Sequence, residues 1–335
     1  MKKLLFGGKA NFYKGNMHCH SNLSDGRLSP EELKDYYKSH GYSFLAITDH
    51  EHINNNSYLD DENFLTITSC EIAIKQFPNM STGVNRDMKV CHLNLYAKEQ
   101  NNDYNACYNE VYDHFSAKER RVAFRRPDKD FERVYGAEGI NEIIKTANEN
   151  GFFVAYNHPR WSLENYGNYC GYEGLWGVEI FNTSCNVGGL YEYDINVLDD
   201  FLRDGKRIFA SSGDDNHNNK KDSFGTFVMV NADKLEYSEI INSLLNGDFY
   251  TSTGPQIYEI SVDGMTVNVK CSDALKINLT TKGRRAMTVN AENGINVNEA
   301  TFNLMDTDGY FRISVLDEKG RRADSQSFWL EDFIK

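Results

Sequence analysis

Short apolar runs alternate with amphipathic segments along about the first 250 residues of the chain. Three of the amphipathic segments, residues 29–40, Glu138–Asn150 and Asp194–Asp204, have the pattern of helices and are followed by glycine. Strands and helices in alternation are typical of an α/β layer fold or barrel. The apolar runs predict strands at Asn16–His18, Phe44–Thr48, Phe64–Ser69, Lys89–Leu95, Phe152–Tyr156, Gly177–Phe181 and Arg207–Ser211.

The pattern changes after Gly254-Pro255. Beyond this point, short alternating runs are separated by turn-forming pairs such as Asp263-Gly264 and Asn293-Gly294, which predicts a small antiparallel β-sandwich. We therefore expect two domains, a barrel-type domain at residues 1–255 and a sandwich at residues 256–335. The strands expected in the sandwich are Ile257–Val262, Thr266–Val269, Lys276–Thr280, Glu299–Leu304 and Phe311–Leu316.

Composition and charge exclude several classes of partner. The 335 residues include 49 acidic and 36 basic ones, so the formal net charge is −13. This balance argues against nucleic acid and anionic membranes as partners, because both require a basic surface. No apolar run is long enough to span a membrane, and the seven cysteines contain no Cys-x-x-Cys motif. We expect reduced thiols and a cytoplasmic protein; the oligomeric state stays open.

Metal-ligating side chains gather where the predicted strands end. Because the carboxyl ends of the strands of a (β/α) barrel converge on one pocket, these side chains are expected to meet. Six histidines and three carboxylates exceed the needs of one tetrahedral zinc, and mixed imidazole and carboxylate donors suit two or three divalent ions such as Mn, Fe or Zn. The nine candidate metal ligands are His18, His20, Asp25, His50, Glu71, His92, His158, Asp215 and His217.

Several short motifs contain or flank these candidate ligands. They are HCHSNLSDG at residues 18–26, SPEEL at 29–33, AITDH at 46–50, Glu71, His92, Asn157-His158-Pro159, Gly177-Val178-Glu179 and Gly213-Asp214-Asp215-Asn216-His217. Together these motifs resemble the PHP (polymerase and histidinol phosphatase) family of metal-dependent phosphoesterases. The resemblance covers about residues 14–255, and the β-rich tail is similar to that of a two-domain subgroup with a C-terminal sandwich.

The resemblance implies a distorted seven-stranded (β/α) barrel with a dinuclear or trinuclear metal centre. By motif, His18, His20, Glu71 and Asp215 would hold one metal, and Glu71 would bridge to a second held by His92 and His158. Asp25, His50 and His217 would hold the third. Asp25 stands where some members of the family have histidine, and the role of Glu179 is left open between supporting the ligands and forming the pocket floor.

The function expected from this resemblance is hydrolysis of a small phosphorylated substrate, nucleotide-like or sugar-phosphate-like, by a metal-bridging hydroxide. Glu71 and Asp215 would organise the catalytic metals, and Arg160 would clamp the phosphate; the alternative for Arg160 is a surface ion pair. A metallohydrolase of carboxyl esters or amides is a second possibility, and a non-catalytic binding module with a vestigial site is a third. The basic segment 118–133 is either a solvated stretch or a charged flap.

Overall fold

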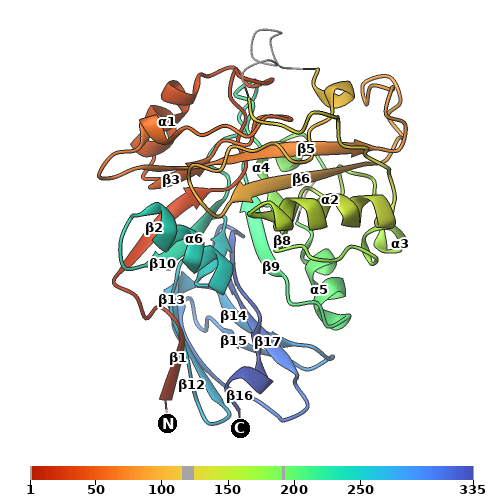
Figure 1. Ribbon diagram of the computed structural model, residues 1–335. Helices are drawn as coiled ribbons and strands as arrows, with labels where there is room; N and C mark the ends of the chain where they lie inside the picture. The colour runs from red at the N-terminus through yellow and green to blue at the C-terminus, as the bar shows by residue number, and fades with distance from the viewer. Residues whose placement is uncertain (1, 115–123, 191–192, 335) are drawn as a thin grey trace.

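A computed structural model describes residues 2–114, 124–190 and 193–334 of the chain. It is a mixed α/β fold (Figure 1), with β5, β6 and most helices in the upper part of the view and the C-terminal strands and both termini in the lower part. Among the described residues, no helix is both long enough and apolar enough to cross a membrane. The helices are α1 (Pro30–Ser39), α2 (Ala137–Glu149), α3 (Tyr166–Tyr169), α4 (Thr183–Val187), α5 (Ile195–Arg203) and α6 (Tyr237–Asn246).

The strands form three sheets. A five-stranded sheet has the order β5 (Ser69–Lys75), β6 (Val90–Ala97), β7 (Phe152–Tyr156), β8 (Gly177–Asn182) and β9 (Phe209–Gly213). A four-stranded antiparallel sheet has the order β1 (Lys2–Phe6), β12 (Ile257–Asp263), β13 (Thr266–Ala274) and β16 (Val297–Asn303). A ten-stranded sheet has the order β15 (Ala286–Asn290), β14 (Lys276–Thr281), β17 (Tyr310–Leu316), β18 (Arg322–Ser325), β11 (Phe249–Ser252), β10 (Phe227–Ala232), β2 (Asn11–Asn16), β3 (Phe44–Ala46) and β4 (Leu65–Ile67), with β19 (Phe328–Trp329) against β17.

The sequence resemblance implied a distorted seven-stranded (β/α) barrel, and closure of such a barrel is not detected among the described residues. In the part of the chain that the structure describes, the ladders of the ten-stranded and five-stranded sheets remain separate. They meet at isolated parallel bridges, Cys19 with Asn216 and His50 with Glu71. The reason is that β2 and β3 end early, at Asn16 and Ala46, and the extended chain beyond them makes only local contacts with the neighbouring sheet.

The position of Glu71 after the run Phe64–Ser69 predicted that it lies at the end of a strand. In the structure it lies within a strand instead. The chain changes sheets at Thr68: β4 runs parallel to β3, and β5 then runs antiparallel to β6, so that Glu71 is the third residue of β5. Both strands are buried along almost their whole length. A continuous apolar run carries no periodicity that would reveal such a change of partner.

Helix α1 has the start that its sequence predicts. Ser29 and Glu32 form a capping box, in which the Ser29 hydroxyl accepts from the Glu32 backbone N–H and the Glu32 carboxylate accepts from the Ser29 N–H. The buried face of the helix includes Tyr37, whose hydroxyl lies 2.8 Å from an Asp214 oxygen and 2.6 Å from the Asn216 side-chain oxygen. The helix is thereby joined to the segment that follows β9.

Two helices cover the five-stranded sheet, and a third packs on the ten-stranded one. Ile140, Ile143 and Ile144 of α2 share a core with Val154 of β7, and Leu198 and Phe201 of α5 belong to the same core. Helix α6 packs on β10 and β11 through its own isoleucines and leucine. These helices thus cover the outer faces of the two sheets, and the candidate ligands lie at an edge away from them.

The C-terminal strands match the predicted sandwich only in part. The four-stranded antiparallel sheet is present, but β14, β15, β17 and β18 belong to the ladder that continues through β11 into β10. The sequence analysis also missed β1, which pairs antiparallel with β12. The boundary at residue 255 falls between β11 and β12 and stays a prediction.

Phe6 provides a test of the contribution of β1. Its ring is buried and lies edge-on to Tyr250 of β11, with centroids 5.6 Å apart, whereas Leu4 of the same strand is 44% exposed. We expect Phe6→Ala to lower the free energy of unfolding by about 3–5 kcal/mol, because it opens a cavity in the core shared by both sheets. Leu4→Ala should cost below about 1 kcal/mol. Urea denaturation of both variants measures the difference, and equal losses would show that β1 contributes no buried anchor.

Candidate metal centre

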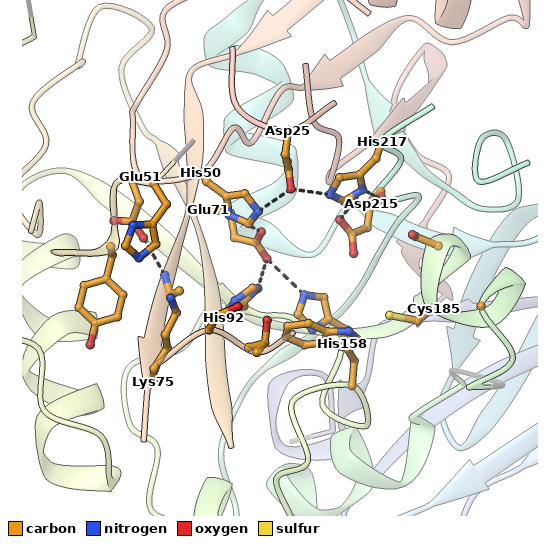
Figure 2. Close-up of a pocket in the computed structure, with 18 of the residues that line it drawn as sticks. Asp25, His50, Glu51, Glu71, Lys75, His92, His158, Cys185, Asp215 and His217 are labelled. Atoms are coloured by element: carbon orange, nitrogen blue, oxygen red, sulfur yellow. Dashed lines mark hydrogen bonds and ion pairs between the residues drawn. The ribbon is translucent and has the colours of Figure 1, made fainter. Parts of the chain in front are cut away.

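The nine candidate ligands come together at one site. Seven of them line one pocket (Figure 2), and the buried His18 and His20 lie against these seven. They arrive from many elements: His18 and His20 follow β2, Asp25 precedes α1, His50 follows β3, Glu71 and His92 lie on β5 and β6, His158 follows β7, and Asp215 and His217 follow β9. Their donor atoms form four overlapping groups, each able to hold a metal ion. The groups are His20, Asp25, His50 and His217; His18, His158 and Asp215; His18, His20 and Glu71; and Glu71, His92 and His158.

The carboxylate of Glu71 lies at the centre of this arrangement and is buried. Five imidazole rings direct a nitrogen at it. Its Oε1 lies 3.3 Å from His18 Nε2, 3.0 Å from His92 Nδ1 and 3.2 Å from His158 Nε2. Its Oε2 lies 3.4 Å from His20 Nε2 and 3.2 Å from His50 Nδ1. One carboxylate therefore contacts donors of all four groups.

The donor atoms have the spacing of ligands that share a cation. Nitrogen and oxygen ligands about 2.0–2.2 Å from a tetrahedral metal lie roughly 3.3–3.5 Å from one another, which is close to the distances around Glu71. The Nε2 atoms of His18 and His20 face each other at 3.3 Å, where at most one of them can carry a proton. Two other buried ring nitrogens, Nδ1 of His20 and Nδ1 of His158, have no hydrogen-bond partner among the described residues. The donor set therefore fits bound metal ions.

The outermost group surrounds Asp25. Its Oδ2 lies 3.3 Å from His217 Nε2 and 3.6 Å from His50 Nε2, and its Oδ1 lies 3.5 Å from His20 Nδ1. The resemblance had placed Asp25, His50 and His217 in the third site, and the structure adds His20 to this group. The three side chains are more accessible here than at Glu71, which places this group at the pocket opening.

Neighbouring charges set the protonation of these groups when no metal is bound. Burial alone would lower the pKa of His50 and of His217, but the Asp25 carboxylate outweighs it and raises each pKa to about 9. Burial lowers the pKa of His20 and of His92, and the neighbouring carboxylates do not offset it. Burial raises the pKa of Asp25, yet His217 and His50 reverse this effect and lower it overall. Without metal, the centre thus combines protonated His50 and His217 with neutral His20 and His92. Metal binding would release the protons of the first pair, because a ligating imidazole is neutral.

Glu179 supports two of the candidate ligands. Its Oε1 accepts from His18 Nδ1 at 3.1 Å, and its Oε2 accepts from the His158 backbone N–H at 3.0 Å and from the Asn182 amide at 2.9 Å. A carboxylate that accepts a hydrogen bond from Nδ1 holds the proton of the neutral ring on that nitrogen. The unprotonated Nε2 of His18 then faces the centre. This geometry decides the role that the sequence left open, and the signal for it was the carboxylate of the Gly177-Val178-Glu179 motif.

Other supporting groups stand within the motifs of the sequence, although the sequence analysis assigned them no role. The Asn157 amide donates to Glu71 Oε1 at 2.8 Å, and Asp49 accepts from Ser21 and Ser24 and so fixes the turn between His20 and Asp25. Asp214 accepts from Tyr37, Thr183 and three backbone N–H groups, while burial raises its pKa to about 6. Each of these residues is a neighbour in sequence of a candidate ligand or of its turn.

Three non-glycine residues at the site adopt the left-handed backbone region. The φ angles are +68° at Glu51, +26° at His158 and +49° at Asp215. Such conformations cost about 1–3 kcal/mol each and persist where the surrounding contacts require them. His158 and Asp215 are themselves candidate ligands, and Glu51 follows His50. The chain is therefore strained where it delivers ligands to the centre.

The pocket has a volume of about 870 Å³, and it includes side chains that the sequence analysis did not select. Lys75 and Lys220 bring positive charge to its wall, and Trp161 lies at its mouth. The Trp161 ring centroid is 5.0 Å from the rings of both His92 and His158. The pocket thus offers an aromatic surface and two lysines beside the metal ligands.

Arg160 lies apart from the other nine predicted site residues. Its side chain is half exposed, and it donates to the Leu190 carbonyl at 3.2 Å and to Asp194 at 3.5 Å. It does not belong to the residues that line the pocket. A phosphate-clamping role for Arg160 stays a prediction, and the described conformation does not place its guanidinium at the metal cluster.

The basic segment 118–133 divides into parts of different character. Its first residues, through 123, lie outside the described residues. Arg125 and Arg126 make exposed ion pairs with Asp103 and Asp130. Arg133 is fully buried and pairs with Glu51, contrary to both interpretations of the segment as a solvated stretch or a flap.

Comparison with known proteins yields distant structural likenesses. No protein-family model and no curated protein matches the chain. A two-domain protein from Bacteroides vulgatus ATCC 8482, containing a predicted PHP-like metal-dependent phosphoesterase, is 15% identical with a TM-score of 0.47, over 98% of this chain and 97% of that one. A presumed metal-dependent phosphoesterase from Bifidobacterium adolescentis ATCC 15703 is 15% identical, and an amidohydrolase from Chromobacterium violaceum, with bound sulfate and no metal, is 16% identical. Each of these two matches covers 61% of this chain and 87% of the other protein's chain, and the TM-scores are 0.35 and 0.37, respectively.

Metal content tests the central position of Glu71. We expect two or three transition metals per chain in the wild type after reconstitution with Mn²⁺ or Zn²⁺, because four donor groups overlap. Glu71→Gln should lose at least one, since an amide is a poor bridge between cations. Glu62→Gln, which changes an exposed carboxylate, is the matched control. Elemental analysis gives the count, and a full complement in Glu71→Gln would contradict the assignment.

A second variant tests the support that Glu179 gives. Glu179→Gln keeps the shape of the side chain but weakens its hold on the Nδ1 proton of His18. We expect metal affinity to fall about 10-fold to 100-fold, as for other carboxylates behind a metal-bound histidine. Competition with a chromophoric chelator measures the affinity. Wild-type affinity in this variant would reduce Glu179 to a packing residue.

Proposed function

We propose that this protein is a PHP-type metal-dependent phosphoesterase that hydrolyses a small phosphorylated molecule. The observation that carries the proposal is the convergence of eight imidazole and carboxylate side chains around the buried Glu71 carboxylate. A site that had lost its function would be expected to have lost some of these donors. Their completeness argues against a binding module with a vestigial centre.

The chain's own residues would hold the metals in overlapping sets. Glu71 would bridge, with His18, His20 and Asp215 on one side and His92 and His158 on the other, while Asp25, His50 and His217 would complete a third set. Divalent ions of the Mn, Fe or Zn type, when bound, would make hydroxide available near neutral pH and neutralise charge on a phosphoryl group. Glu179 and Asn157 would keep His18 and Glu71 in their orientations.

The rest of the pocket suits a phosphorylated substrate. Lys220 lies three residues beyond His217 and lines the same pocket, where it can pair with phosphoryl oxygens. Trp161 restricts the mouth beside His92 and His158 and offers a flat apolar surface to the organic part of the substrate. Arg160 could join them only by leaving its contacts with Leu190 and Asp194.

The same donors could serve the hydrolysis of carboxyl esters or amides. The lysines in the pocket favour the phosphoester, because a neutral ester carries no charge for them to pair with. We further propose a cytoplasmic location, supported by seven cysteines that are all free.

Turnover measurements distinguish these activities. Wild-type protein loaded with Mn²⁺ is screened against phosphomonoesters, phosphodiesters and carboxyl esters, and we expect turnover of phosphoesters. Glu71→Gln should lower kcat by about 10³-fold or more, roughly 4 kcal/mol at the barrier. Arg160→Ala should mainly raise KM if Arg160 turns toward the substrate. Turnover of carboxyl esters alone, or a near-normal kcat in Glu71→Gln with full metal content, would refute the proposal.

A further inference from the structure

Lys75 lies on the same strand and the same face as Glu71. Side chains at alternate positions of a strand point to one side of the sheet, and Glu71, Ala73 and Lys75 of β5 all line the pocket. Four residues at about 3.3 Å each place the two Cα atoms roughly 13 Å apart. Figure 2 shows Lys75 at one end of the pocket, with Glu71, His92 and His158 between it and Cys185. The amine is thus separated from the metal ligands by the length of a small organic group.

The carboxylate whose charge acts on Lys75, that of Glu51, is already paired with another residue. Arg133 donates two hydrogen bonds to the Glu51 carboxylate, from Nη1 to Oε1 at 2.9 Å and from Nη2 to Oε2 at 2.6 Å. Its remaining N–H groups donate to the carbonyls of Ala73 and Cys107, at 2.7–3.0 Å. Both Arg133 and Glu51 are buried. Lys75, Arg133 and Glu51 together therefore carry a net charge of +1.

The surroundings of Lys75 also favour an anionic ligand over water. Its amine lies 5.5 Å from the centre of the Tyr112 ring, and the Arg133 guanidinium lies 4.8 Å from that ring. Burial lowers the pKa of Lys75, which shows that its ammonium has lost part of its hydration. A bound anion would restore that lost stabilisation. The ring, the buried ion pair and β5 form a fixed wall around the amine.

We infer that Lys75 is the anchor of a second anion subsite, so that the substrate carries another anionic group, a phosphate or a carboxylate, beyond the phosphoryl group at the metals. This inference rests on the proposed function for the identity of the first group. The reach of the lysine side chain back along β5 sets the separation of the two groups at roughly 7–10 Å. The substrate class is therefore a small phosphoester with anionic groups at both ends.

Binding of non-hydrolysable phosphonates tests the subsite without relying on turnover. Metal-loaded wild-type protein is titrated calorimetrically with hexane-1,6-bisphosphonate and with hexylphosphonate, which differ in the second anion. We expect the bisphosphonate to bind at least about tenfold more tightly, the effect of one charge-assisted pair. Ethane-1,2-bisphosphonate is too short to reach both ends and should show no gain that depends on Lys75.

Three lysine variants assign the effect. Lys75→Met should reduce the preference to below about twofold, and Lys75→Arg should retain it because the charge is kept. Lys89→Met is the matched control: this lysine lies just before β6, and its amine donates to Asn168 at 2.8 Å. It should leave the preference unchanged. Metal content measured on each variant confirms that the centre is intact.

The outcomes separate this inference from the proposed function. Equal binding of the two hexyl ligands by the wild type, or a preference that survives in Lys75→Met, overturns the subsite even if phosphoesters are hydrolysed. A preference that depends on Lys75, in a protein that turns over no phosphoester, would support the subsite and refute the proposed hydrolysis. Loss of the preference in Lys89→Met as well would assign it to general charge and overturn the subsite.

Discussion

The position of one carboxylate, that of Glu71, determines most of what surrounds it. A carboxylate that is buried and contacted by five imidazoles is stable only if its negative charge is balanced. Either protons on the imidazoles or bound cations can balance it. Glu179 fixes the tautomer of His18, and Asn157 donates to Glu71 itself. The residues behind the centre therefore serve the same electrostatic requirement as the residues within it.

This requirement also explains where the two large sheets meet. The two isolated parallel bridges pair His50 with Glu71 and Cys19 with Asn216, so both of them join segments that deliver candidate ligands. Strands that continued as regular ladders would direct alternate side chains away from the pocket. Early strand ends and three residues with positive φ allow neighbouring stretches of chain to turn their donors inward. The irregular seam between the sheets is thus the place where the centre can be built.

The sequence predicted those features whose signals are local. The capping box of α1 is visible in Ser29 and Glu32, and the candidate ligands were recognisable because they occur in short motifs. Features that depend on a distant partner could not be predicted. The change of sheets at Thr68 has no periodicity to reveal it, and β1 is recognisable only through its pairing with β12. Arg133 resembled a solvated residue because its partner, Glu51, lies 82 positions away.

The pairing of β1 with β12 has a consequence for synthesis of the chain. Residues 2–6 leave the ribosome well before their partner strand, which ends at Asp263. At 5–20 residues per second, the interval between the two is roughly 13–50 s. Throughout it, a strand carrying Leu4, Leu5 and Phe6 has no native edge to pair with. Its two lysines, Lys2 and Lys3, place positive charge beside this apolar stretch, and charge of this kind discourages nascent chains from associating through an unpaired strand.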